Sequence, residues 1–212
     1  MIDFEQIPAA SQQGFVAFMQ ELHARTRQLG LRLNVALPLD DDSYPYAALG
    51  AASDRVHLMA YDQHDGSGAS GPVAAQGWLQ AALQTRLADL KAGQVVLDVG
   101  NYGYDWAAGG GQAGNVSFQD ALTLAHDTGG RLSLDAASLN PTFGYSDEQS
   151  RAHTVWYLDA VSTFNSVQAA LRLGVNQVAL WRMGTEDPRV WQVLNVPALS
   201  APGGLNADVA AS

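Results

Sequence analysis

The chain has 212 residues, enough for one large domain or two small ones. Its 11 basic and 21 acidic side chains give a net charge of −10, which argues against a nucleic-acid partner. The sequence contains no cysteine, which excludes disulfides and cysteine nucleophiles, and no apolar run is long enough to span a membrane.

Five segments have the pattern of buried β-strands, and helical patterns alternate with them. The predicted strands cover residues 1–5, 31–39, 56–61, 95–99 and 175–181. The predicted helices cover residues 11–30, 45–52, 76–90, 118–127 and 162–173. This alternation is typical of parallel βα units.

The alternation is interrupted in the second half of the chain. A glycine loop is predicted at residues 109–111, short strands at 131–134 and 153–158, and turns at Asn140-Pro141 and Gly144. Beyond Pro197 the composition shifts to Ala, Ser, Gly and Pro, so residues 198–212 are expected to form a linker or a disordered tail.

The predicted fold class is α/β. Polar side chains such as Asp40, Asp62 and Asn101 follow the strands, at the end where a (β/α)8 barrel carries its active site. Five of eight strands, the first beginning at residue 1, predict the C-terminal part of such a barrel, about strands 4–8. A five-stranded flavodoxin-like sheet is the alternative, but no glycine-rich phosphate-binding motif follows any strand.

Two carboxylic acids lie in the first predicted strand. Asp3 and Glu5 are two residues apart, so their side chains point to the same face, about 6–7 Å apart along the chain. Two carboxyl groups at this distance do not both ionise readily, so one of them is expected to serve as a proton donor near neutral pH. The alternative is an exposed acidic pair on a frayed terminus.

Aromatic and polar residues follow three other predicted strands. Tyr61-Asp62 ends one strand, the segment 101–106 (NYGYDW) follows another, and Trp181 ends the last. Gly103, between two tyrosines, would let the backbone approach a ligand closely. The structural alternatives are a capping Asp62, a packed aromatic loop and a core Trp181. Acids beside aromatic rings are what glycoside hydrolysis requires.

These motifs stand in the order found in the family 18 glycoside hydrolases, the chitinase-like barrels. Residues 3–5 (DFE) resemble the end of that family's DxxDxDxE signature in strand four, and residues 59–62 (MAYD) resemble its MxYD sequence in strand six. Residues 102–106 and 141–159 resemble the bacterial branch that acts on peptidoglycan or other envelope glycans, and Trp181 completes the order. The resemblance covers nearly the whole chain up to residue 194.

The resemblance implies a role for each matching residue. Glu5 would be the general acid that protonates the glycosidic oxygen. Asp3 would orient the substrate's 2-acetamido group and stabilise the positive charge as its carbonyl attacks the anomeric carbon. Tyr61 would hydrogen-bond the acetamido group, Asp62 would help to hold substrate and acid, and Trp181 would form the floor of the sugar site.

Further residues of the same motifs are expected to bind substrate, namely Met59, Asn101, Tyr102 and Tyr104 together with Trp181. Neither a metal nor a cofactor is expected. The expected partner is an oligosaccharide or polysaccharide, with no nucleic acid and no membrane span in this chain. The resemblance leaves open whether a full-length parent carries further fused domains.

The sequence departs from the family pattern at its start. Met1 stands where the signature has its middle aspartate, which helps Asp3 to shift its proton and its rotamer. The three strands that precede the signature are also missing, so the chain is interpreted as N-terminally truncated. Residues 1–197 are expected to form the partial barrel, with a small α+β insertion at about residues 109–159, after strand 7. Unpaired sheet edges predict poor stability and no activity for the chain alone.

The implied activity is hydrolysis of β-linked N-acetylglucosamine-containing glycans, such as chitin, peptidoglycan or poly-N-acetylglucosamine, by substrate-assisted retaining catalysis. The alternative is a non-catalytic carbohydrate-binding protein, either a chitinase-like lectin or a degenerate envelope or spore-coat protein. Lectins of this kind usually lose the acid, whereas Glu5 is present. An extracellular, periplasmic or cell-envelope location is expected from the resemblance.

Overall fold

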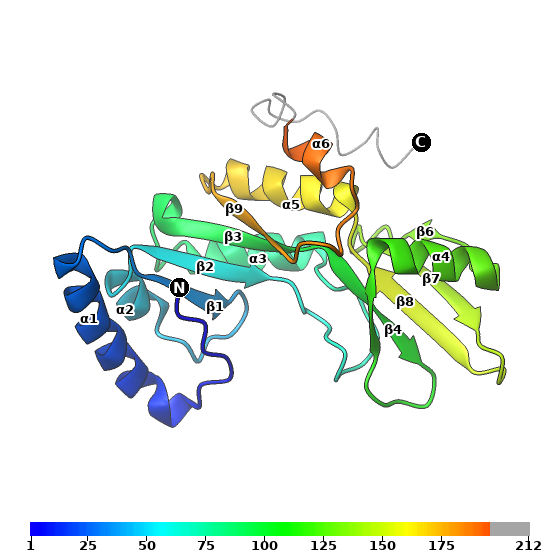
Figure 1. Cartoon of the computed structure of the whole chain (residues 1–212), viewed down its shortest axis with the longest axis horizontal. Helices are drawn as coiled ribbons and strands as arrows, with labels where there is room; N and C mark the ends of the chain where they lie inside the picture. The colour runs from blue at the N-terminus through cyan, green and yellow to red at the C-terminus, as the bar shows by residue number, and fades with distance from the viewer. Residues whose placement is uncertain (196–212) are drawn as a thin grey trace.

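The computed structural model describes residues 1–195. It contains two sheets that lie side by side along the long axis of the molecule (Figure 1). A parallel sheet has the strand order β1-β2-β3-β9, and an antiparallel sheet has the order β5-β4-β8-β7-β6. The tail predicted at residues 198–212 lies outside the described residues.

The parallel sheet consists of four of the five predicted parallel strands, in chain order. Its strands are β1 (Asn34–Pro38), β2 (Arg55–Ala60), β3 (Val95–Gly100) and β9 (Val178–Trp181). Each strand pairs in parallel with the one before it, as in a sheet that winds in one direction only.

The first predicted strand pairs with β1 at one residue only. Ile2 forms a single parallel bridge with Val35, in which its N–H donates to Asn34 O at 2.8 Å and its carbonyl accepts from Ala36 N at 2.9 Å. Residues 1–5 therefore lie beside β1 in the predicted place, but the regular strand predicted there is reduced to this bridge.

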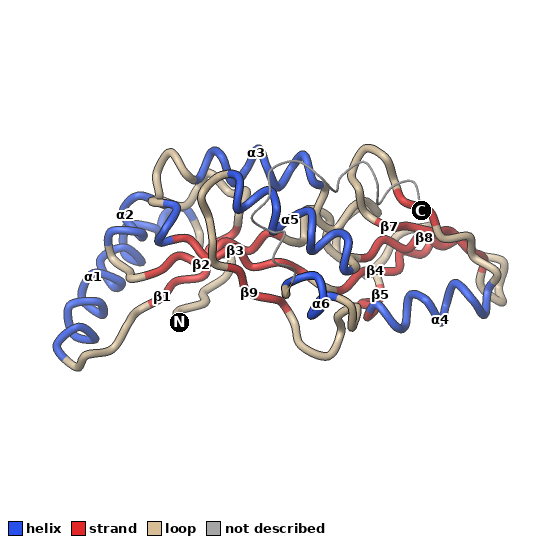
Figure 2. The backbone as a smooth tube through the Cα atoms, turned by 90° about the horizontal axis from the view of Figure 1, so that it is seen from above, coloured by secondary structure: helices blue, strands red, loops and turns tan. Residues whose placement is uncertain are grey.

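Four helices cover one face of the parallel sheet: α1 (Gln12–Gln28), α2 (Tyr46–Ala51), α3 (Gln76–Arg86) and α5 (Ala160–Arg172). Figure 2 shows these helices beside the strands. The hydrophobic core lies between them and includes Met19, Leu49 and Leu83 from helices and Leu58 and Leu97 from strands. Short helical turns at Ala9–Ser11 and Ala92–Gln94 and the helix α6 (Val190–Leu194) complete this part.

Burial along β2 alternates, with its even-numbered residues buried and its odd-numbered residues half-buried. Within residues 1–195 the apolar core therefore lies on one side of this sheet, and the half-buried side chains of β2 lie on its other face. A flavodoxin-like sheet needs helices on both faces and a reversal of strand order. The flavodoxin-like alternative is therefore wrong, and the chain-order winding is that of a barrel.

The antiparallel sheet occupies the chain between β3 and β9 and is the α+β insertion of the predicted fold, but it begins with β4 at Tyr102 and not at about residue 109, because residues 102–107 pair with β5 and β8. Its strands are β4 (Tyr102–Ala107), β5 (Gly114–Ser117), β6 (Ser133–Leu134), β7 (Pro141–Ser146) and β8 (Ala152–Tyr157). The helix α4 (Phe118–Thr128) packs on one face through Phe118, Ala121 and Ala125. A capping box formed by Ser117 and Asp120 fixes where this helix begins.

Two local predictions in this region differ from the structure. The turn predicted around Pro141 and Gly144 is wrong, because these residues belong to β7; Pro141 is tolerated there as the first residue of the strand. Gly103 lies within β4, where a Cβ would come within 2.3 Å of the Trp156 carbonyl oxygen. The glycine therefore permits close packing of β4 against β8.

Candidate active site

The carboxyl ends of the parallel strands bring several predicted site residues together. Met59 and Tyr61 are two residues apart at the end of β2, so they share a face opposite the buried Ala60. Trp181 ends β9, where it pairs with Gly100 of β3. These side chains lie on the face of the sheet that the helices leave uncovered.

Tyr61 is the centre of an aromatic cluster at this face. Its ring stacks on Trp181 with ring centroids 6.4 Å apart and 13° between the planes, and it meets Tyr102 edge-on at 6.1 Å. A Cβ at Gly100 would lie 2.8 Å from the Tyr61 Cβ, so a glycine is needed for Tyr61 to pack this closely against β3. Trp181 is 49% exposed, which leaves its ring open to a ligand.

Asp62 is held by two phenols from the antiparallel sheet. The Tyr102 hydroxyl donates to Asp62 Oδ1 at 2.5 Å, and the Tyr104 hydroxyl donates to the same atom at 2.9 Å. Burial raises the pKa of Asp62, although both hydrogen bonds act to lower it. Burial also raises the pKa of both tyrosines, so the two phenols remain protonated donors. The position of Asp62 thus depends on both sheets.

A cavity of about 280 Å³ opens beside Tyr61, with Glu5, Met59 and Asp62 in its wall. Asp3 and Glu5 are both exposed. The pKa of Tyr61 is raised first by burial and then by the surrounding carboxylates, among them Asp3 and Glu5. Both predicted acids therefore lie close enough to Tyr61 for their charges to act on its phenol.

Asn101 lies behind Trp181. It is 3% exposed, and its N–H donates to the Trp181 carbonyl at 3.0 Å. Its Oδ1 accepts from the Arg182 N–H at 2.7 Å and from the Thr185 hydroxyl at 2.8 Å. In the structure, Asn101 therefore fixes the segment that carries Trp181.

Trp78 and Asp40 also line this cavity, although the sequence did not assign them to the site. The indole N–H of Trp78, on α3, donates to Asp40 Oδ2 at 2.7 Å after the end of β1. Asp40 stood out only as a polar residue after a strand, and the helical pattern gives Trp78 no signal of its own. Contacts between a helix and a distant loop leave no local mark in the sequence.

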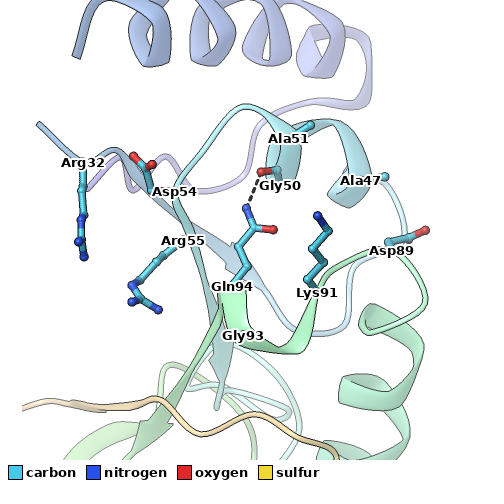
Figure 3. Close-up of a pocket in the computed structure, with 10 residues that line it drawn as sticks. All are labelled: Arg32, Ala47, Gly50, Ala51, Asp54, Arg55, Asp89, Lys91, Gly93 and Gln94. Atoms are coloured by element: carbon cyan, nitrogen blue, oxygen red, sulfur yellow. Dashed lines mark hydrogen bonds between the residues drawn. The ribbon is translucent and has the colours of Figure 1, made fainter. Parts of the chain in front are cut away.

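A larger cavity lies elsewhere, at the opposite end of the parallel sheet. It has a volume of about 810 Å³ and is lined by Arg32, Arg55, Lys91 and Gln94 among others. Figure 3 shows Arg32 and Arg55 extending to one side while the Lys91 ammonium points elsewhere. This cavity is not the candidate active site, because its charged groups do not converge on one point. In addition, (β/α)8 barrels have their active sites at the carboxyl ends of the strands, which is the other end of this sheet.

Within residues 1–195, no group of three or more His, Asp or Glu side chains is arranged to hold a metal ion. No helix of the same range has the length and apolar character needed to cross a membrane.

No protein-family model matches the chain. The sporulation-specific glycosylase YdhD of Bacillus subtilis is 29% identical over 86% of this chain and 46% of its own length. The cortical fragment-lytic enzyme of the same organism is 27% identical over 91% of this chain and 48% of its own length. The chain thus spans about half the length of these curated relatives.

The solved structure of a chitinase from Chromobacterium violaceum superposes with a TM-score of 0.85 at 28% identity, over 91% of this chain and 63% of that one. The resemblance to chitinase-like glycoside hydrolases is confirmed. The fold class is confirmed as well: α/β, with the parallel strands of part of a (β/α)8 barrel and an α+β insertion.

Proposed function

We propose that the protein is a glycoside hydrolase that cleaves β-linked N-acetylglucosamine-containing glycans. The observation that carries the proposal is a single cleft at the carboxyl ends of the parallel strands, where Glu5, Tyr61 and Asp62 meet beside the open ring of Trp181. The relatives, named as a glycosylase, a cortical fragment-lytic enzyme and a chitinase, support this reaction class.

The residues divide the proposed reaction between them. Glu5, exposed at the cavity wall, protonates the glycosidic oxygen as the bond to the leaving sugar breaks. Trp181 offers its ring face to the sugar, and Tyr61, stacked on it, presents its hydroxyl to the 2-acetamido group. Burial and the nearby carboxylates raise the pKa of Tyr61, so its hydroxyl stays protonated and can donate a hydrogen bond.

The acetamido oxygen of the substrate is the proposed nucleophile. It attacks the anomeric carbon to form a cyclic cation, and water then opens that ring with retention of configuration. Asp3 orients the acetamido group, and the carboxylates around Tyr61 stabilise the positive charge that develops. Asp62, which accepts hydrogen bonds from two tyrosine hydroxyls, helps to hold the substrate in position relative to Glu5.

The proposed substrates are glycans of the cell envelope, with peptidoglycan first, because two relatives are named for sporulation and cortex. Since the chain spans 63% of the chitinase that it matches, we propose the activity for the complete-barrel protein, meaning these strands together with the remaining strands of a barrel. Chitin and poly-N-acetylglucosamine carry the same acetamido group and are the simplest assay substrates.

The test is Glu5→Gln in the complete-barrel protein, with Glu148→Gln as the matched control on an exposed turn far along the chain. Glu5→Gln is expected to retain binding of an N-acetylglucosamine oligomer while turnover falls by roughly 10²–10⁴-fold, the range for a general acid. Glu148→Gln should change neither. Binding without turnover in the wild type would identify a carbohydrate-binding protein instead.

A further inference from the structure

Three polar side chains from three neighbouring strands meet on the uncovered face of the parallel sheet. His57 Nδ1 lies 2.8 Å from Asp98 Oδ1, and His57 Nε2 lies 3.4 Å from Asn34 Nδ2. The side chains of His57 and Asp98 are only 15% and 11% exposed. A chain of ionisable groups at this depth is unusual, because barrel interiors are filled mainly by branched apolar residues.

The hydrogen-bonding atoms assign an orientation to this chain. With Nδ1–H donating to Asp98, the Nε2 of neutral His57 accepts from the Asn34 amide. The Asn34 Oδ1 is buried and has no partner among the described residues. Turning this amide by 180° would offer Oδ1 to an Nε2–H, so the same three side chains hold His57 in either protonation state.

Asp98 lies next to Tyr61. Ala60 pairs with Val99, so Tyr61 comes opposite Gly100, and Asp98 is two residues earlier on the same face of β3. The close approach of Tyr61 to Gly100 brings the phenol towards this strand. After burial, Asp98 is the charged group that raises the pKa of Tyr61 most.

We propose that Asp98, oriented by His57, is a positioning residue that acts on the reaction through Tyr61. The inference rests on the proposed function, in which Tyr61 holds the acetamido group. A buried carboxylate beneath Tyr61 favours the positive charge that forms beside that group, and His57 and Asn34 fix where this carboxylate points. The other charged groups around Tyr61 are Asp3, Glu5 and Asp62.

The kinetic test is a double-mutant cycle of Asp98→Asn and Tyr61→Phe in the complete-barrel protein, on an N-acetylglucosamine oligomer. Asp98→Asn is expected to lower kcat about tenfold with little change in KM, and to have a much smaller effect when Tyr61 is already Phe, since contacting residues couple. Additive losses in the cycle, or a change in KM alone, would overturn the proposal.

The role of His57 has its own variants. His57→Asn places an amide N–H near the position of Nδ1 and should restore most of the kcat that His57→Leu loses. An equal loss of kcat in the two variants would show that the hydrogen bond from His57 to Asp98 does not matter for the reaction.

A spectroscopic readout separates this inference from the proposed function. In the unliganded protein labelled with 13C at the tyrosine Cζ, the Tyr61 signal, assigned with Tyr61→Phe, should move in Asp98→Asn. It should stay in place in Asp89→Asn, a control at the opposite end of the sheet. If the chemical shift of Tyr61 is unchanged in Asp98→Asn, the inference is overturned even if the enzyme is active. A shift without any glycan turnover supports the coupling and refutes the proposed function.

Discussion

The parallel sheet packs four helices on one face and the antiparallel sheet packs α4 on one face, and Asp62 beside the cleft is the point where their other faces meet. The parallel sheet presents ionisable groups and the stacked pair of Tyr61 and Trp181. The antiparallel sheet presents Tyr102 and Tyr104, whose hydroxyls both hold Asp62. The difference suggests that the first sheet performs the proposed chemistry and the second holds its parts in place.

Among the variants that separate the two sheets, the largest expected effect compares one tyrosine from each region. Tyr61→Phe removes the proposed hydrogen bond to a charged, reacting group, which typically contributes about 1.5–3 kcal/mol, so turnover should fall roughly 10–100-fold. Tyr104→Phe removes one of two donors to Asp62 and should cost only a few-fold. Steady-state rates on an N-acetylglucosamine oligomer measure both; equal losses would erase the distinction between the sheets.

Trp181 should matter for affinity more than for rate. Trp181→Ala removes the exposed ring and its stacking on Tyr61, so the affinity for an N-acetylglucosamine oligomer is expected to fall about tenfold. Trp191→Ala is the control, because Trp191 is similarly exposed at 46% but lies on α6. Calorimetric titration measures the affinity of both variants for the oligomer. An equal loss of affinity in the two variants would argue against Trp181 as the floor of the sugar site.

Ser117 tests whether the antiparallel region can be weakened without touching the chemistry. Ser117→Ala removes the side chain that accepts from Asp120 N at 3.0 Å and should cost about 1 kcal/mol of stability. Ser146→Ala, on an exposed strand position, should cost little. Thermal unfolding measures the loss, and glycan binding by Ser117→Ala should remain that of the wild type.

The smallest expected effect is a pH-dependent gain in stability from Asp62→Asn. The pKa of Asp62 is raised above its ordinary 3.8, so ionising this carboxyl group destabilises the folded protein. The destabilisation is complete at pH values above the raised pKa and disappears as the pH falls below 3.8. Asn still accepts from both tyrosines. The variant should therefore unfold at a slightly higher temperature than the wild type at pH 7 and at the same temperature near pH 3. A loss of stability at pH 7 would show that the carboxylate charge is favourable there.

Patterns within single segments predicted the parallel strands, their helices and the barrel, because apolar periodicity and strand ends are local features. Tyr61, Asp62 and Trp181 stood out for the same reason. The strands β4 and β7 were not predicted, because Gly103 and Pro141 are residue types that normally mark turns. Both segments form strands because they pair with strands that are distant in the sequence. The bonds Trp78–Asp40 and His57–Asp98 join residues 38 and 41 positions apart, which no local pattern reveals.

The most direct test of the proposed chemistry compares hydrolysis rates of two glycan oligomers that differ only at C2 of the reacting sugar. An acetamido group at C2 supplies the nucleophile that Asp3 and Tyr61 are proposed to hold, whereas a free amine or hydroxyl does not. We predict that the acetylated oligomer is hydrolysed at least about 10²-fold faster, while both oligomers are bound. Equal rates, or a glycosyl ester trapped on Asp3, would contradict it and make Asp3 the nucleophile.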